Sequence, residues 1–377
     1  MYRNTWMEVN LDAIKENVET IKDICNKEII AVLKADAYGC GDSHVARAVL
    51  AAGASMIAVS SLDEALMLRN EGYEGDLLIL GATLSEDVEI LVKENISVAA
   101  YSLEWLNSLK EVKPKGLKVH IKVDTGMNRI GLKDKEVIKK ALEELLDLGC
   151  VVEGIFTHYP CADDPSQKET LKQFDLFKDV VNSLDYSFRW VHGDNSDATL
   201  SLKEDFTNAV RLGISMYGVN SYGVKLRYPI SLHTRVAMIK KVNKGERIGY
   251  GLTYETKEDE IIATLPIGYA DGLIRKNQGR KVYIDGMFCE IVGRVCMDQI
   301  MVRLDREVEV GCDVEIFGPH IHLEEMAEEL ETIPYEIICL ISGRVTRTYI
   351  WEGKDLEENA RLLKSEVTEV NKKCSGS

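Results

Sequence analysis

The sequence predicts an α/β protein, a (β/α)8 TIM-type barrel followed by a C-terminal mainly β domain, and three observations lead to this prediction. Short β-rich runs alternate with helical patterns over residues 28–215, with a spacing of roughly 20 to 35 residues. Eight such runs can be counted, which is the number of strands in a closed barrel. After residue 217, Gly-containing turns replace the long helices between the runs.

The eight predicted barrel strands are short runs rich in residues that favour β-structure. They are "IIAVL" (29–33), "MIAVS" (56–60), "LLILG" (77–81), "SVAAY" (97–101), "LKVHIKV" (117–123), "VVEGIF" (151–156), "FRWVH" (188–192) and "NAVRLGI" (208–214). Between them, stretches such as residues 61–72 and 166–184 have apolar residues at helical spacing, and Gly72 and Gly149 are expected to end helices. A doubly wound sheet would show the same alternation, but a count of eight favours a closed barrel.

The C-terminal part of the chain shows strand patterns in residues 231–251, 259–272 and 280–304. The N-terminal "TWMEVNL" is also strand-like and could join the same domain. We therefore predict a barrel over residues 10–224 and a β domain formed by residues 1–9 and 225–377. The tail "NKKCSGS" has the composition of a disordered segment.

Composition limits the classes of function. The chain has 377 residues, 45% of them hydrophobic, and a formal net charge of -16, so we expect no nucleic-acid partner. The nine cysteines are scattered without CxxC spacing, which predicts neither disulfides nor a metal site and indicates a reducing compartment. We find no signal-peptide core and no run of about 18 apolar residues. The expected location is the cytoplasm, or the cytoplasmic domain of a larger membrane-anchored protein.

Polar and charged residues follow the predicted strands, at the barrel end where active sites of this fold lie. These residues are Lys34 and Tyr38 after the first run, Arg129 after the fifth, His158 after the sixth, the segment "HGDNSD" (192–197) after the seventh, and Arg211 in the eighth. Lys34 alone could be a rim lysine with a buried aliphatic stem, and the histidines could be hydrogen-bonded core residues. Such groups at five strand ends together favour an active site. A strand-end lysine in apolar surroundings would have a lowered pKa and could act as a nucleophile.

Several fragments resemble the alanine racemases, which are fold-type III pyridoxal 5'-phosphate enzymes. The fragments are "AVLKADAYGCG", "KVDTGMNRIGL", "THYPCADD", "NAVRLGISMYG", "RIGYGLTYE", "PIGYADG" and "VGRVCMDQ", and they occur in the family's order over about residues 5–350. The resemblance implies a barrel with a C-terminal β domain, a head-to-tail homodimer with shared active sites, and a small amino acid as substrate. It also implies a role in supplying D-alanine for peptidoglycan.

The resemblance implies cofactor roles for a first group of residues. Lys34 corresponds to the lysine that binds pyridoxal phosphate covalently. Tyr38, Ser196, Gly213 and Ile214 correspond to phosphate-binding positions, with Asn195 next to them. Arg211 resembles the arginine that faces the pyridine nitrogen. Because a guanidinium keeps its protons, that nitrogen would stay unprotonated and the ring would be a weaker electron sink, which limits side reactions.

A second group of residues corresponds to the family's catalytic and substrate positions. Racemisation needs a base on each face of Cα, and Tyr250 of the other subunit resembles the second base beside Lys34. A free tyrosine has a pKa of about 10, so His158, Arg211 and His192, which resemble a hydrogen-bonded chain, would favour its phenolate. By resemblance, Arg129 and Met297 bind the substrate carboxylate. Lys122, Tyr269 and Asp298 have supporting roles. Lys122 corresponds to a position that is carbamylated in some members.

Two segments depart from the family pattern. In "CLISGRVTR", Gly343 stands where some members have a tyrosine that contacts the phosphate, and its absence would open space beside the substrate Cβ. Serine, the substrate of racemase domains associated with vancomycin resistance, is therefore the alternative to alanine. In "HGDNSD", Asp194 and Asp197 replace small neutral residues. Because carboxylates repel a phosphate, we expect them to point away and to cap the following helix.

Two other classes of function share the barrel lysine. A fold-type III decarboxylase is usually longer than this chain and uses a cysteine in a different C-terminal setting. A small non-catalytic cofactor carrier lacks the C-terminal β domain. The fragments around Tyr250 and "CMDQ" favour a racemase over both.

Overall fold

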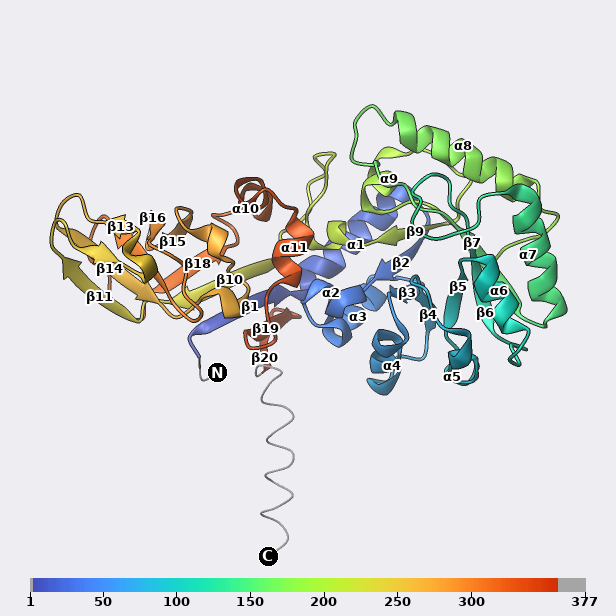
Figure 1. The fold of residues 1–377 in the computed structure, drawn as a ribbon, viewed down its shortest axis with the longest axis horizontal. Coiled ribbons are helices and arrows are strands. Elements are labelled where there is room, and N and C mark those ends of the chain that lie inside the picture. Colours follow the sequence, from blue (N-terminus) through green and yellow to red (C-terminus); the bar gives the residue numbers. More distant parts are fainter. Residues whose placement is uncertain (1–2, 359–377) are drawn as a thin grey trace, which may run out of the picture. The chain divides into compact units, whose positions relative to one another are not determined.

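A computed structural model describes residues 3–358 of the chain, which fold into two compact units (Figure 1). The barrel unit consists of Ile14–Ala37 and Asp42–Arg227. The sheet unit consists of the described parts of Met1–Ala13, Tyr38–Gly41 and Tyr228–Ser377. The tail for which the sequence predicts disorder lies outside the described residues.

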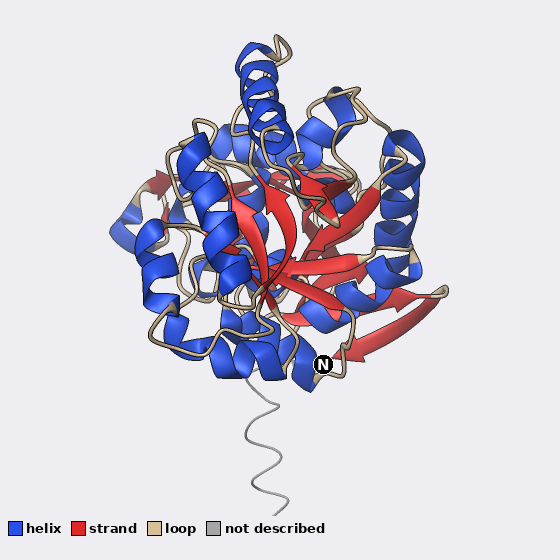
Figure 2. Cartoon of the chain, turned by 90° about the vertical axis from the view of Figure 1, so that its right-hand side faces the viewer, coloured by secondary structure: helices blue, strands red, loops and turns tan. Residues whose placement is uncertain are grey.

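Eight parallel strands close the barrel unit, which confirms the predicted fold class. They are β2 (Glu28–Val32), β3 (Met56–Val59), β4 (Asp76–Ile79), β5 (Ser97–Ala100), β6 (Lys118–Lys122), β7 (Val151–Phe156), β8 (Trp190–His192) and β9 (Ala209–Leu212). The sheet closes because β2 pairs with β3 on one side, through Ile30 and Met56, and with β9 on the other, through Ile30 and Arg211. Figure 2 shows the strands surrounded by helices.

Several helices associated with the barrel begin after a residue whose side chain satisfies one of the first backbone N–H groups. The helices are α1 (Leu11–Cys25), α2 (Lys34–Tyr38), α3 (Asp42–Ala51), α4 (Leu62–Asn70), α5 (Val88–Lys93), α6 (Leu103–Leu109), α7 (Lys135–Asp147), α8 (Lys168–Asn182) and α9 (Ser196–Ser201), with 3-10 turns η1 (Ser85–Asp87) and η2 (Ile214–Tyr217). The side chains of Ser61, Ser102 and Asp134 accept a backbone N–H in the first turns of α4, α6 and α7. Gly72 and Gly149 each follow a helix and have a positive φ, as expected of residues that end helices.

Side chains from several barrel strands pack together in a buried cluster. The cluster contains Ile30, Val32, Met56, Ala58, Leu78, Trp190 and Ala209. The last strand is shorter than its apolar run, because β9 ends at Leu212 and Gly213 leaves the extended conformation (φ -124°, ψ -99°). The chain then enters η2, so backbone N–H groups at this strand end are free of the strand ladder.

A ten-stranded sheet dominates the sheet unit. Its order is β11 (Met238–Val242), β14 (Glu260–Leu265), β17 (Ile300–Leu304), β16 (Met287–Val292), β15 (Lys281–Ile284), β18 (Asp313–Phe317), β10 (Ile230–Arg235), β1 (Thr5–Asn10), β19 (Thr346–Trp351) and β20 (Lys354–Glu358). The N-terminal strand lies inside this sheet, because Trp6 pairs with His233 of β10 and with Thr346 of β19. The shorter elements are β12 (Arg247–Ile248), β13 (Tyr254–Glu255), η3 (Tyr250–Leu252), η4 (Tyr269–Asp271), η5 (Arg275–Asn277), α10 (Leu323–Leu330) and α11 (Pro334–Cys339).

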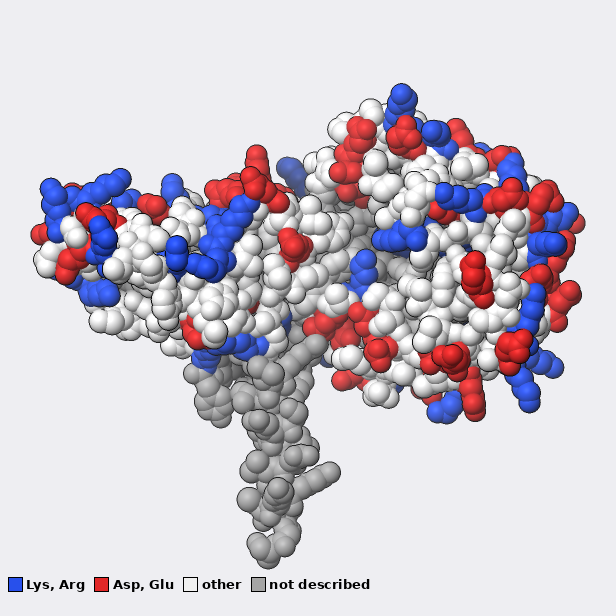
Figure 3. All heavy atoms as spheres, in the orientation of Figure 1, with Lys and Arg blue, Asp and Glu red and all other residues white. Residues whose placement is uncertain are grey.

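Charged side chains of both signs alternate over the face of the chain shown in Figure 3. This mixture accompanies the net charge of -16. Within residues 3–358, no helix combines the length and the apolar character needed to cross a bilayer.

Candidate active site

Lys34 begins a left-handed turn directly after the first barrel strand. Ala35, Asp36 and Ala37 have φ of 53°, 59° and 51° with ψ between 47° and 49°, and Tyr38 continues at φ 59°. L-residues in this conformation cost roughly 1–2 kcal/mol each relative to the right-handed form. Strain of this kind is typically maintained where a functional group must be held in place.

Hydrogen bonds from three parts of the barrel unit hold the left-handed turn. The Ala35 N–H donates to Glu64 Oε1 at 2.8 Å, and the Ala37 N–H donates to the Leu33 carbonyl at 2.8 Å. The Tyr217 hydroxyl, which is buried, donates to the Ala37 carbonyl at 2.8 Å. The turn is therefore fixed by the surrounding structure, and with it the backbone position of Lys34.

Arg211 on β9 is almost completely buried, and its guanidinium is held by four acceptors. Nη1 lies 2.8 Å from His192 Nδ1, and Nη2 lies 3.1 Å from His158 Nδ1. Nη2 also donates to the carbonyls of Thr157 at 2.8 Å and Gly193 at 2.9 Å. In the part of the chain that the structure describes, Nε and the second Nη1 proton have no acceptor, so donors remain for a ligand.

Cationic side chains gather around His158. Burial lowers the pKa of His158 well below its usual value, and the positive charges of Arg211, Arg129, Lys122 and Lys34 lower it further. Burial together with Arg211 also keeps the pKa of His192 well below its usual value. Both imidazoles are therefore neutral near pH 7, and the basic side chains around His158 suit an anionic ligand.

Lys122 and Arg129 lie on β6 and on the loop that follows it. Lys122 is 3% exposed, and burial with the charge of Arg211 lowers its pKa to about 7. Its Nζ donates to the Val123 carbonyl at 2.7 Å and lies 5.3 Å from the centre of the Phe156 ring. Asp124 shapes the loop by accepting the N–H groups of residues 126 and 128, and Arg129 is exposed on it.

Hydroxyl groups and backbone N–H groups converge where β8 and β9 end. Asn195 caps α9, because its Oδ1 accepts the Ala198 N–H at 3.0 Å. Ser196 Oγ accepts the N–H groups of Gly213 at 3.0 Å and Ser215 at 3.3 Å. Ile214 lies between these two residues and begins η2. The predicted phosphate-binding residues Asn195, Ser196, Gly213 and Ile214 are thus brought together.

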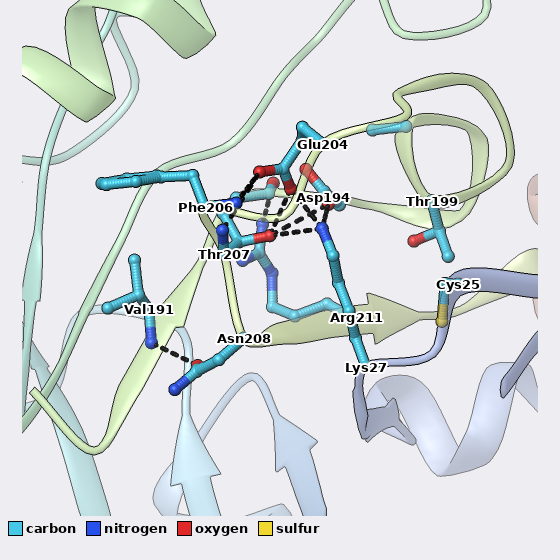
Figure 4. Close-up of polar contacts among 12 residues, drawn as sticks. Cys25, Lys27, Val191, Asp194, Thr199, Glu204, Phe206, Thr207, Asn208 and Arg211 are labelled. Carbon is cyan, nitrogen blue, oxygen red and sulfur yellow. Dashed lines mark hydrogen bonds and ion pairs between the residues drawn. The ribbon is translucent and has the colours of Figure 1, made fainter.

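Asp194 does not cap α9, so that expectation was wrong. Its buried carboxylate lies 3.3 Å from Lys27 Nζ and 3.3 Å from Thr207 Oγ1, and Lys27 also pairs with Glu204 (Figure 4). Burial raises the pKa of Asp194 to about 6. Asp197 does not cap the helix either, because its Oδ1 accepts the Ser221 N–H. Asn195 is the cap because it occupies the extended position immediately before the helix.

The remaining predicted site residues belong to the sheet unit. Tyr250 begins η3 after Gly249, which has φ 76°, and its side chain is 71% exposed. It lines a depression of ≈ 950 Å³ with Cys296 and Gln299. Tyr38 is buried and its ring lies 5.8 Å from that of Tyr335, and this burial raises the pKa of Tyr38.

Tyr269, Met297 and Asp298 lie on two loops that hydrogen-bond to each other. The Tyr269 N–H donates to the Cys296 carbonyl, and the Ala270 N–H donates to the Met297 carbonyl, both at 3.0 Å. The Asp298 carboxylate accepts from Arg344 at 2.7 Å. These residues therefore form a group in the sheet unit, separate in sequence from the group around Arg211.

Sequence reasoning missed two residues that contact the Arg211 group. His120 on β6 lies 3.0 Å from His192, and Glu153 on β7 lies 3.4 Å from His120. A signal was present in "KVHIKV", because alternate residues of a strand share a face and His120 therefore shares one with Lys122. The glutamate gave no signal of its own within its apolar run.

Comparison with known proteins identifies two domains of one family. The profile of the alanine racemase N-terminal domain matches residues 9–221, and that of the alanine racemase C-terminal domain matches residues 229–349. Alanine racemase 1 of Bacillus subtilis is 41% identical over 97% of this chain and 98% of its own length. The alanine racemase of Streptococcus pyogenes serotype M12 is 41% identical over 92% of this chain.

Solved structures agree with these matches. The alanine racemase of Bacillus anthracis with bound L-Ala-P has a TM-score of 0.90 and 40% identity, covering 95% of this chain and 98% of that one. A histidine racemase from Leuconostoc mesenteroides has a TM-score of 0.86 and 30% identity, covering 93% and 99%. With both domains matched and relatives aligned over nearly their full length, this chain belongs to the alanine racemase family of enzymes.

Proposed function

We propose that the protein interconverts L- and D-alanine with pyridoxal 5'-phosphate, using Lys34 and Tyr250 of the partner subunit as the two bases. The observation that carries the proposal is the buried Arg211 guanidinium, held by two neutral histidines and two carbonyls with N–H donors remaining. When bound, this cofactor withdraws electrons from the substrate Cα and so makes its proton acidic.

The residues of the barrel unit fit this cofactor. The spare N–H donors of Arg211 suit the lone pair of an unprotonated ring nitrogen. The Ser196 hydroxyl accepts from residues 213 and 215, so its own proton, together with the backbone N–H of Ile214, is a donor of the kind that binds a phosphate. The Asp194 side chain bonds to Lys27 and Thr207, so its charge is engaged elsewhere. Tyr38 is proposed as a further phosphate donor.

The two proposed bases differ in how they are supported. Lys34 would hold the cofactor and move the proton on one face of Cα, from a backbone position fixed by the left-handed turn. For the other face, His158 must accept the Arg211 proton at Nδ1, since arginine only donates, and so carries its own proton at Nε2. A donor at Nε2 would stabilise the phenolate of the partner's Tyr250.

Arg129 and Met297 are proposed to bind the substrate carboxylate, Arg129 as a charged fork and Met297 of the partner subunit through its backbone amide. Lys122 would support Arg129 after carbamylation. Its pKa of about 7 supports this modification, because an appreciable share of the amine is then unprotonated and nucleophilic at neutral pH. Tyr269 and Asp298 are proposed to hold the loop that carries Met297.

Serine is the second candidate substrate, and Gly343 is the feature that favours it. This glycine is exposed in the turn between α11 and β19, where it supplies space and no side-chain donor. Arg347 fixes the turn by donating to the carbonyls of Ser342 and Val345, both at 2.6 Å. A histidine racemase among the similar structures indicates that this fold accommodates side chains other than methyl.

The cellular setting is also a proposal. A homodimer with shared sites would supply D-alanine for peptidoglycan from the cytoplasm, or from the cytoplasmic domain of a larger membrane-anchored protein. Size-exclusion chromatography with light scattering measures directly whether the protein is a homodimer. A strictly monomeric active enzyme would contradict shared sites.

One experiment tests the proposed activity. The purified chain, loaded with cofactor, is incubated with L-alanine or with L-serine, and loss of optical activity is followed by circular dichroism. We expect a higher kcat/KM for alanine and a measurable rate for serine. Carbon dioxide release would indicate a decarboxylase, and retained optical activity with both substrates would indicate a carrier or a racemase for another amino acid.

A further inference from the structure

A chain of buried polar side chains continues from Arg211 into the barrel interior. His192 Nε2 lies 3.0 Å from His120 Nδ1, and both side chains have no exposed surface. His120 Nε2 lies 3.4 Å from Glu153 Oε1, and no acceptor closer than this contacts it within residues 3–358. Glu153 also accepts from the Ser97 hydroxyl and lies 3.8 Å from Lys118 Nζ. The chain therefore joins the strand ends near Arg211 to the start of β5 and β6.

The hydrogen-bond direction along this chain follows from the chemistry of arginine. A guanidinium has only donors, so His192 Nδ1 must be the acceptor of the bond from Arg211. A neutral His192 then carries its proton on Nε2 and donates it to Nδ1 of His120. By the same argument, His120 is protonated on Nε2, facing the Glu153 carboxylate. One permanent donor thus determines the tautomers of two histidines, and a carboxylate ends the series.

The ionisation states agree with this direction. Burial lowers the pKa values of His192 and His120, so both rings are neutral near pH 7. Burial raises the pKa of Glu153, but the nearby His120 ring and the hydrogen bond from Ser97 outweigh that effect and leave it below its usual value. Glu153 is therefore an anion that accepts from the Ser97 hydroxyl and faces His120 Nε2.

The barrel backbone makes room for these rings. A Cβ on Gly154 would overlap the His120 imidazole, although Gly154 lies in the middle of β7. The register between β6 and β7 also shifts between Val119 and His120. On the other side, the Phe156 ring stacks on His192 with centroids 4.9 Å apart and planes at 4°. Each imidazole is thus confined to one orientation by a neighbour on β7.

We propose that His120 and Glu153 are positioning residues for Arg211, which act by holding His192 in the tautomer that accepts from the guanidinium. With the opposite tautomer, His192 Nδ1–H would face an arginine N–H, and two donors would repel. Arg211 would then leave the orientation that presents its spare donors. The inference rests on the proposed function only for what those donors face, a ring nitrogen of the cofactor.

The first test is a direct measurement of the tautomers. Nitrogen-15 NMR of the cofactor-loaded protein, labelled at histidine, distinguishes a protonated ring nitrogen from an accepting one, and single variants assign the signals. We expect an unprotonated Nδ1 and a protonated Nε2 on both His120 and His192. A protonated Nδ1 on either ring overturns the proposal. This measurement does not need racemase activity, so its outcome is distinguishable from failure of the proposed function.

The second test is a pair of variants at one position. His120→Leu removes the acceptor for His192, whereas in His120→Gln the amide can still accept from His192 and donate to Glu153. We expect His120→Leu to lower kcat about tenfold with KM for alanine unchanged, and to shift the absorption band of the bound cofactor. His120→Gln should restore both properties to within about threefold of the unaltered protein.

A control separates positioning from loss of stability. Val152→Ala shortens a buried β7 side chain that does not belong to the series Arg211, His192, His120 and Glu153. It should lower Tm about as much as His120→Leu does, without shifting the absorption band of the bound cofactor. If His120→Leu leaves the band and kcat unchanged, or if His120→Gln is as damaging as His120→Leu, His120 has no positioning role. Glu153→Gln tests the far end, and we expect an effect between those of the two His120 variants.

Discussion

The two groups of functional residues differ in how completely their surroundings hold them. In the barrel unit, Arg211 is 4% exposed and bonded to groups from several strand ends. In the sheet unit, Tyr250 and Met297 are 71% and 53% exposed. Buried groups with fixed partners are preorganised, whereas an exposed phenol keeps its conformational freedom until something covers it. Under the proposed function, the barrel would supply a formed half of the site, and the sheet unit of a partner subunit would supply the other half.

The largest effect should come from breaking the barrel half. Lys34→Ala removes both the proposed attachment point of the cofactor and one proposed base, so we expect racemisation to fall by at least about 10⁴-fold. The exposed Lys115→Ala is the matched control and should retain activity. In the unaltered protein, the visible absorption band should disappear on borohydride reduction, and peptide mapping should recover the label on Lys34. Recovery on another lysine would remove the basis of the mechanism.

The next largest effect should come from the sheet half. Tyr250→Phe removes one of the two proposed bases while the barrel groups stay in place, so we expect retained cofactor and about 10³-fold slower racemisation. Proton exchange from one enantiomer should fall more than exchange from the other. Tyr254→Phe, which loses a hydrogen bond to Glu260, is the control and should change activity little. Equal impairment of both exchange reactions would argue that Tyr250 is structural.

A mixture of the two inactive variants tests whether the halves come from different subunits. If Lys34→Ala and Tyr250→Phe chains are unfolded and refolded together, hybrid dimers pair an intact Lys34 with an intact Tyr250 at one of their two sites. Random pairing should restore about one quarter of the unaltered activity. Each variant refolded alone is the control. No recovery in a mixture shown to contain hybrids would mean that both bases belong to the same chain.

A smaller effect concerns the free-energy cost of burying the charged form of Lys122. The pKa of Lys122 falls from 10.5 to about 7, so the fold disfavours its charged form. The penalty is complete below pH 7, decreases as pH rises from 7 to 10.5, and is absent above that range. In carbon dioxide-free buffer, Lys122→Met should therefore stabilise the protein by up to about 5 kcal/mol at pH 6 and by progressively less toward pH 10. A pH-independent difference in unfolding free energy would contradict this cause.

The smallest effect should come from Gly343→Tyr in the sheet unit. Filling the space beside Cβ should lower serine turnover more than alanine turnover, and change the ratio of the two kcat/KM values by roughly tenfold. The substitution should not strain the backbone, because the described glycines with positive φ do not include Gly343. Gly343→Ala is the matched control, with little added volume. An unchanged ratio would remove the sequence support for serine.

Most of the fold could be predicted from local patterns. Short strand-like runs, alternating with helical patterns, located all eight barrel strands, because strands and helices differ in the spacing of their apolar residues. The ends of the strands were less predictable, as β9 shows by stopping before Gly213. The cap of α9 was predicted wrongly because Asp194 and Asn195 are both good capping residues, and only the backbone geometry decides between them.

The sequence by itself determined the strand count, the two-part pattern and the order of the family fragments, because these depend on the period and spacing of residue types. Tertiary structure alone decided the left-handed turn after Lys34, which four L-residues do not adopt by local preference. It also decided the series Arg211, His192, His120 and Glu153, whose members are distant in the chain and come together only when β6 to β9 close the barrel. Hydrogen-bond direction is a property of such an assembled series, because each tautomer depends on the neighbour that it faces.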